Sequence, residues 1–143
     1  MHLLVATDGS EHAMRAAAFA ARLTRELPGA QVTLLNVGHI PSAALAGPAA
    51  GTMIDLGALE TSLERAGASI LAKTQQQFAG DVRVTQWYRS GDPANEIIKA
   101  AAEAKADIIV MGTRGFGQIG GLILGSVSER VLHGASVPVL IIR

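Results

Sequence analysis

Glycine is concentrated in one short interval of this sequence, and that interval is the first candidate for chemistry. Six of the 16 glycines lie between Gly112 and Gly125, in the run GTRGFGQIGGLILGS. Glycine lets main-chain N–H groups approach an anion closely, and the start of a following helix adds positive partial charge. Arg114 lies in the same run and supplies a full positive charge. The segment therefore predicts a site for a phosphate-bearing ligand.

Two widespread phosphate-binding patterns do not explain this run. The Walker pattern requires a lysine after the second glycine, and the run contains no lysine. Gly115, Gly117 and Gly120 match G-x-G-x-x-G, but the acidic residue expected about 20 positions later has no place before Arg143. We interpret that match as chance. A glycine-rich turn that ends in a capping box, Ser126 to Glu129, stays open as an alternative without a ligand.

The rest of the chain alternates the patterns of strands and helices. Short apolar runs predict five strands: His2–Thr7, Gln31–Val37, Asp81–Tyr88, Asp107–Met111 and Val137–Ile142. Apolar residues at helical spacing predict four helices: Ser10–Leu27, Met53–Phe78, Asp92–Ala104 and Ser126–His133. The segment Gly38–Thr52 is predicted to be a long loop.

This alternation predicts one α/β domain over residues 1–143, built on a mostly parallel sheet. The strand Asp107–Met111 is the most apolar and is expected to lie centrally. Ligands of such sheets bind beyond the carboxyl ends of the strands. Three of those ends are at Thr7-Asp8, Val37-Gly38 and Met111-Gly112, and the glycine run begins at the third.

Composition excludes several classes of function. The chain has no cysteine, which excludes disulfides and thiolate metal sites, and its 12 basic residues balance 12 acidic ones. The chain therefore has no net positive charge that would attract nucleic acid. No apolar run approaches the ~18 residues needed to span a membrane. The amino terminus lacks a secretory pattern, so we expect a cytoplasmic protein. The four histidines are scattered and predict no metal site, and no G-x-S-x-G elbow is present.

Three blocks of the sequence resemble the universal stress protein family. Gly112-x-x-Gly115, nine spacers and Gly125-Ser126 match its nucleotide-binding signature G-2x-G-9x-G-(S/T). Asp8-Gly9-Ser10 is similar to the family's first turn, and GSVSERVLHGASVPVLIIR is similar to its carboxyl-terminal block. The resemblance covers essentially the whole chain. It implies a Rossmann-like, doubly wound parallel sheet of five strands in the order 3-2-1-4-5, with helices on both faces and dimerisation through Val137–Ile142.

The same resemblance implies an ATP site, with Mg²⁺ able to join through the phosphates. Asp8, with Ala6 and Thr7, would lie by adenine and ribose, and Val37 and Met111 would flank the base. Ribose and phosphates would be held by five residues, with Val127 contributing through its main chain: Gly112, Gly115, Gly125, Ser126 and Ser128. Arg114 is added to this set on electrostatic grounds. Because many ATP-binding members have a basic residue in the nine-residue spacer and Phe116–Leu124 has none, we predict weaker ATP binding here.

The leading hypothesis is a dimeric regulatory module of the stress response that binds ATP. One alternative is a slow ATPase or autophosphorylating enzyme with Ser126 or Ser128 as phosphate acceptor, although no residue provides a convincing general base. Another is a dimer of the family's non-nucleotide branch that acts by protein contact alone, and the intact glycine signature argues against it.

Overall fold

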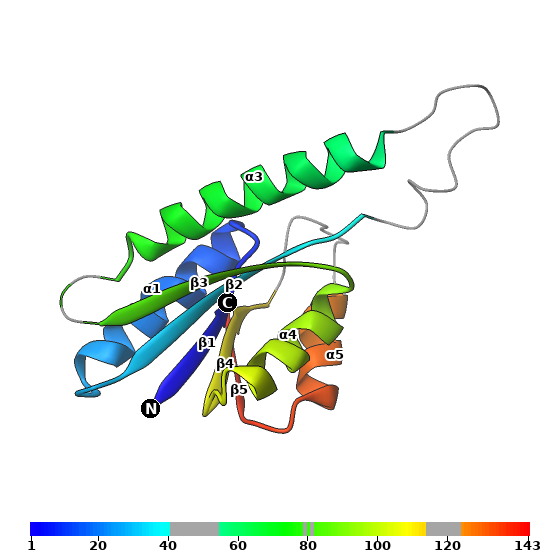
Figure 1. The fold of residues 1–143 in the computed structure, drawn as a ribbon. Coiled ribbons are helices and arrows are strands. Elements are labelled where there is room, and N and C mark those ends of the chain that lie inside the picture. The colour runs from blue at the N-terminus through cyan, green and yellow to red at the C-terminus, as the bar shows by residue number, and fades with distance from the viewer. Residues whose placement is uncertain (41–54, 79, 81, 114–123) are drawn as a thin grey trace.

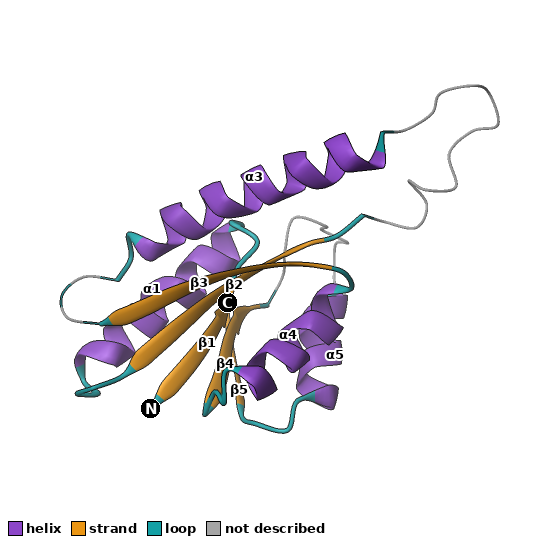
Figure 2. Ribbon diagram, in the orientation of Figure 1, coloured by secondary structure: helices purple, strands orange, loops and turns teal. Residues whose placement is uncertain are grey.

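The computed structural model describes residues 1–40, 55–78, 80, 82–113 and 124–143. Five strands form one parallel sheet in the order β3-β2-β1-β4-β5, as the resemblance implies (Figures 1 and 2). Most of the predicted loop Gly38–Thr52 lies outside the described residues, as do Arg114 and Gly115. The elements are β1 (His2–Ala6), α1 (Glu11–Arg25), β2 (Gln31–Gly38), α3 (Leu56–Gln75), β3 (Arg83–Ser90), α4 (Pro93–Glu103), β4 (Ile108–Gly112), α5 (Ser126–Gly134) and β5 (Val139–Ile142).

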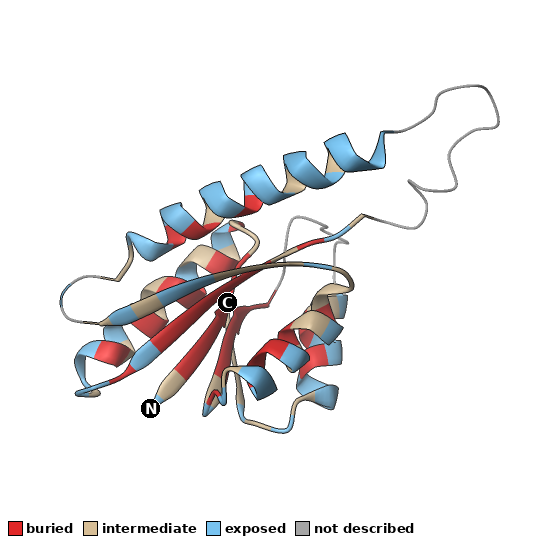
Figure 3. Cartoon of the chain, viewed as in Figure 1, coloured by how far each residue is buried: buried red, intermediate tan, exposed pale blue. Residues whose placement is uncertain are grey.

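The sheet is covered on both faces, by α1 and α3 on one side and by α4 and α5 on the other (Figure 1). Because successive side chains of a strand point to opposite faces, β1 supplies both cores. Leu3 and Val5 pack with α1 and α3, whereas Leu4 and Ala6 pack with α4 and α5. The middle strands are buried almost throughout, and the outer surfaces of the helices are exposed (Figure 3).

Local sequence signals set the starts of three helices. The side chains of Ser10, Asp55 and Asp92 accept hydrogen bonds from main-chain N–H groups three residues later, as N-caps do. Asp92 is followed by Pro93 at the first helical position, where the N–H that proline lacks would have no partner within the helix. Each of these helix starts is therefore set by residues within four positions of one another in the sequence.

Three sequence predictions are corrected by the structure of the sheet and of α5. The strand at the centre of the sheet is β1, and β4 lies beside it between β1 and β5. The predicted capping box at Ser126 is wrong, because Gly125 is the N-cap of α5 and the cap has no side-chain hydrogen bond. Strand β5 begins at Val139 rather than Val137, since Pro138 has no N–H to donate to the ladder.

None of the helices in the described part of the chain combines the length and the apolar character needed to cross a bilayer.

Candidate functional site

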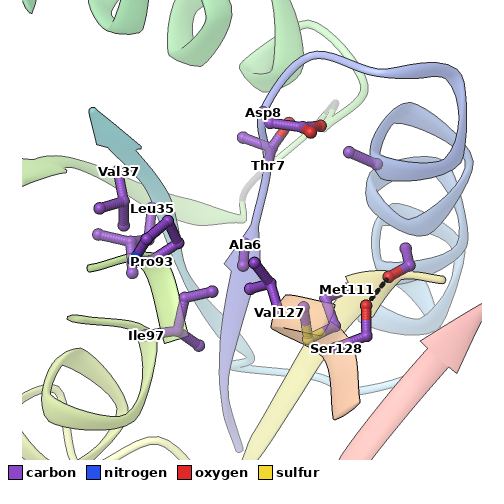
Figure 4. A pocket seen from close by; sticks show the side chains of 12 residues that line it. Ala6, Thr7, Asp8, Leu35, Val37, Pro93, Ile97, Met111, Val127 and Ser128 are labelled. Atoms are coloured by element: carbon purple, nitrogen blue, oxygen red, sulfur yellow. Dashed lines mark hydrogen bonds between the residues drawn. The ribbon is translucent and has the colours of Figure 1, made fainter. Parts of the chain in front are cut away.

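A cavity of about 160 Å³ lies at the carboxyl ends of β1, β2 and β4, on the face covered by α4 and α5. Figure 4 shows Leu35, Val37, Pro93 and Ile97 on one side of this cavity, with Met111, Val127 and Ser128 across from them. Its walls are mainly apolar. The full lining is Ala6, Thr7, Asp8, Ala13, Leu35, Val37, Pro93, Ile97, Met111, Gly112, Val127 and Ser128.

Eight of the residues singled out in the sequence meet in this cavity. They come from three strand ends and the first turn of α5: Ala6, Thr7, Asp8, Val37, Met111, Gly112, Val127 and Ser128. Gly125 and Ser126 are described but do not line it, and Arg114 and Gly115 lie outside the described residues. The structure therefore brings distant sequence blocks together at one sheet edge.

The β1 corner, Thr7 to Ser10, is closed mostly by short-range hydrogen bonds. Thr7 is buried, and its Oγ1 accepts a hydrogen bond from the Gly9 N–H at 3.2 Å. Asp8 Oδ1 accepts one from the Ser10 N–H at 3.0 Å, and Ser10 caps α1. Gly9 has a φ of +81°, a left-handed conformation that favours glycine. The corner thus turns the chain sharply and leaves the Asp8 carboxylate at the cavity.

Two longer-range contacts fix the position of the β1 corner. The Asn36 side-chain amide donates to the Thr7 carbonyl at 2.8 Å, which ties β2 to the end of β1. Thr7 Oγ1 also lies 3.3 Å from Thr74 Oγ1, near the end of α3. Both contacts are buried, so water competes little for these groups.

The β4 corner, Met111–Thr113 together with Gly125–Ser128, is closed by residues far apart in the sequence. The buried Ser128 hydroxyl donates toward the carbonyls of Gly112 and Thr113, at 3.0 and 3.1 Å. The Gly125 N–H donates to the Thr113 carbonyl at 2.7 Å. These bonds hold the first turn of α5 against the end of β4. Ser128 therefore has a structural task that the sequence pattern did not show.

Gly112 of β4 lies close against the start of α1. A Cβ at Gly112 would lie 2.7 Å from the His12 carbonyl carbon and 2.9 Å from the Ala13 nitrogen. Both are main-chain atoms that cannot move without shifting the helix. Beside them, Thr113 Oγ1 and His12 Nδ1 are 3.2 Å apart and share a hydrogen bond. Gly112 is thus required by packing, whatever else it binds.

Sequence reasoning missed four residues of the cavity wall. Leu35 follows from the strand pattern, since it lies two positions before Val37 and shares its face. Pro93 and Ile97 are four positions apart and so lie on one side of α4. Nothing in the local sequence says that this side faces the end of β2. Ala13 is a buried residue of α1, which the sequence predicts as a helix, but its place at the cavity depends on how α1 packs.

The chemistry that this arrangement supports is binding by shape, with one charged group. Asp8 is the only ionisable residue among the described residues that line the cavity. No cluster of three potential metal-binding side chains occurs within the described ranges. An apolar slot with one carboxylate at its end suits a flat, largely apolar group that carries hydroxyl donors.

An ion pair outside the cavity fixes the two helices that wall it. Arg130 of α5 donates from its two terminal nitrogens to Asp92, at 2.8 and 2.7 Å. These hydrogen bonds, followed by that from the Asn95 N–H, lower the Asp92 pKa to about 2. Asp92 precedes Pro93 of the cavity wall, so the pair links the start of α4 to α5.

Comparison with known proteins agrees with this geometry. Residues 1–143 match the sequence model of the Universal stress protein family. A universal stress protein of Thermus aquaticus is 39% identical over 141 residues, which cover 99% of this chain and 97% of that protein. One of Bacillus subtilis is 31% identical over 145 residues, covering 99% and 97%. The solved structure of a universal stress protein in complex with cAMP has a TM-score of 0.73 and 25% identity, covering 100% and 97%. The chain belongs to the universal stress protein family.

Proposed function

We propose that this chain is a single-domain regulatory module that binds an adenine nucleotide, ATP, in the cavity at the carboxyl ends of β1, β2 and β4. The observation that carries the proposal is the meeting of Asp8, Val37, Met111 and the first turn of α5 around one apolar slot. The related solved protein is a complex with cAMP, which supports an adenine nucleotide as the ligand.

The size of the slot matches the base rather than the whole nucleotide. A cavity of about 150 Å³ holds a benzene-sized ring, so about 160 Å³ with an open side admits a planar base. Val37 and Met111 would contact its two sides, with Ala6 and Thr7 beside it. Asp8 would accept hydrogen bonds from ribose hydroxyls, because its Oδ1 already accepts from Ser10 and its Oδ2 has no partner among the described residues.

The phosphates are assigned to the glycine signature. Gly112, Gly115, Gly125, Ser126 and Ser128 would lie along ribose and phosphates, with the main chain of Val127 and the charge of Arg114. Gly125 and Ser126 begin α5, whose amino end favours anions. Since Asp8 is the only carboxylate among the described lining residues, a Mg²⁺ ion would take most of its oxygen ligands from phosphates and water.

Calorimetry with ATP, AMP and cAMP, with and without Mg²⁺, tests this proposal directly. We expect ATP binding in the micromolar range, weakened by the absence of basic residues in Phe116–Leu124. Val37→Phe should fill the slot and abolish the heat of binding. Val84→Phe is the matched control, because Val84 is also a half-buried strand valine but packs on the opposite face. No heat with any nucleotide, and no adenine released from fresh protein by acid, would refute the proposal.

The positions of Ser126 and Ser128 leave Ser126 as the better candidate acceptor for the alternative in which the protein phosphorylates itself. The Ser128 hydroxyl is buried and donates to the carbonyls of Gly112 and Thr113, which opposes a role as phosphate acceptor. Ser126 is exposed at the first position of α5. Phosphate incorporation from labelled ATP that disappears in Ser126→Ala would favour autophosphorylation over binding alone.

We propose further that two copies pair through β5, in the cytoplasm. Among the strands described, β5 lies at the sheet edge and pairs only with β4. Its four residues are apolar and half-buried, and an open apolar edge favours pairing with another strand. Light scattering should give the mass of a dimer, and a monomer at high protein concentration would contradict this.

A further inference from the structure

A second hollow, of about 540 Å³, lies between one side of α1 and the end of β5, and it shares no lining residue with the first cavity. We call it the arginine groove and define it by Arg15, Phe19, Arg22, Arg25, Ile142 and Arg143. It contains four of the 12 basic residues of a chain whose net charge is zero. The groove plays no part in the proposed nucleotide site.

Most of these arginines lack an acidic partner. Arg15 pairs with Glu11 at 3.2 Å, at an exposed position. Within the described residues, Arg22, Arg25 and Arg143 form no ion pair with Asp or Glu. Guanidinium groups bind carboxylates and phosphates with two parallel hydrogen bonds. The groove thus presents several donors that are ready for an anionic partner.

The shape of the charge pattern favours an extended ligand over a single anion. Arg15, Arg22 and Arg25 lie on one side of α1, because they are spaced by seven and three residues. From Arg15 to Arg25 the row extends about 15 Å at ~1.5 Å per residue. An extended peptide covers that distance in about four or five residues.

The floor of the groove is apolar, and this decides the class of ligand. The Arg22 guanidinium lies over the Phe19 ring, 5.5 Å from its centre, and Ile142 of β5 adds an aliphatic wall. A nucleic acid backbone or a polyphosphate chain would use the arginines but leave the aliphatic wall uncovered. A peptide that mixes acidic and apolar side chains would use both. We propose that the arginine groove is a docking surface for an extended acidic and apolar segment of a partner protein.

The test uses the 143-residue chain and a short fluorescein-labelled peptide of alternating glutamate and leucine, and binding is measured by fluorescence anisotropy. Arg22→Glu with Arg25→Glu should weaken binding about tenfold or more, because each change replaces an attraction by a repulsion. Arg65→Glu with Arg83→Glu is the matched control, since both arginines are exposed and lie on other elements. Equal losses in the two double variants, or no loss in the first, would overturn the proposal.

A Phe19→Ala variant distinguishes binding of a partly apolar peptide from binding of a polyanion without apolar groups. Phe19→Ala should weaken the glutamate–leucine peptide several-fold and leave a glutamate–serine peptide of the same length nearly unchanged. Circular dichroism and thermal unfolding of each variant show that the fold is retained. Inorganic polyphosphate or single-stranded RNA of equal charge should bind less tightly than the glutamate–leucine peptide. If either binds as tightly, the assignment to a protein partner is wrong.

Discussion

The β1 corner and the β4 corner perform the same task by different means. At each corner a buried strand is followed directly by a buried threonine, Thr7 after β1 and Thr113 after β4. At the β1 corner the chain enters α1 almost at once, through Asp8 and hydrogen bonds that span two or three residues. At the β4 corner, Thr113 is held by Gly125 and Ser128, twelve and fifteen positions away.

This difference determines what each corner depends on. Closing a short turn costs little chain entropy, whereas holding two distant segments together costs more and must be offset by packing and buried hydrogen bonds. The β4 corner therefore relies on a few close contacts, notably those of Gly112 and Ser128. We expect substitutions there to reduce stability more than those at the β1 corner.

The largest effect is expected from Gly112→Ala. The new methyl group would collide with the main chain of α1 near His12, so helix and strand must separate. We expect a loss of about 1–3 kcal/mol in the free energy of unfolding, measured by urea denaturation. Gly57→Ala is the control, because Gly57 lies in exposed α3 with its nearest neighbour at 3.4 Å, and the change should be neutral or stabilising. A stable Gly112→Ala protein would show that the contact is not tight.

The second largest loss of stability is expected from Ser128→Ala. It removes the hydroxyl that bridges α5 to β4 and leaves the Gly112 carbonyl without that donor. A loss of about 1–2 kcal/mol is expected from urea denaturation, together with weaker nucleotide binding in calorimetry. Ser126→Ala, at an exposed position of the same helix turn, should leave stability nearly unchanged. Equal stability of the two variants would contradict the claim that the hydrogen bonds of Ser128 stabilise the β4 corner.

A smaller effect is expected at the β1 corner from Thr7→Val. The substitution keeps the shape of the side chain and removes the acceptor for the Gly9 N–H and the contact with Thr74. The Asn36 bond to the Thr7 carbonyl is unaffected, because it involves the main chain of Thr7. We expect a loss of about 0.5–1.5 kcal/mol in thermal or urea unfolding. A loss of stability larger than that of Ser128→Ala would contradict the expectation that the β4 corner is the more sensitive of the two to substitution.

The smallest effect concerns the ion pair that tethers α5 from outside. Hydrogen bonds from Arg130 lower the Asp92 pKa from its ordinary 3.8 to about 2. The contribution of the ion pair to the free energy of unfolding is therefore fully present above pH 3.8. It is lost as the pH falls toward about 2 and Asp92 becomes protonated. Because both side chains are partly exposed, that contribution should stay below about 1 kcal/mol.

Asp92→Asn tests this, since the amide oxygen can still cap α4. Urea unfolding at a series of pH values should show a smaller acid-dependent loss of stability in the variant than in the wild type. Identical pH profiles would mean that the tether contributes nothing to the β4 corner.

Much of the site could be predicted because its signals are local. The caps at Ser10 and Asp92 are read within four residues, and the apolar strands are read from short runs. The predicted cap at Ser126 is wrong because the N-cap of α5 is Gly125, one residue earlier. The serine of this turn that has a structural role is Ser128, whose hydroxyl donates back to the Gly112 carbonyl of β4. Helical spacing alone does not distinguish a serine that caps its own helix from one that bonds to a distant strand.

Local signals in the sequence are enough to predict the α/β alternation, the strand ends at which the cavity lies and the glycine spacing typical of the family. These follow from burial patterns and turn chemistry that act over a few residues. The packing of the elements, in contrast, is needed to show that Pro93 and Ile97 line the cavity, that Gly112 contacts the start of α1, and that α1 and β5 form the arginine groove. The physical reason is that such contacts depend on how helices pack across a sheet, and the distance between two packed elements is not encoded in either one alone.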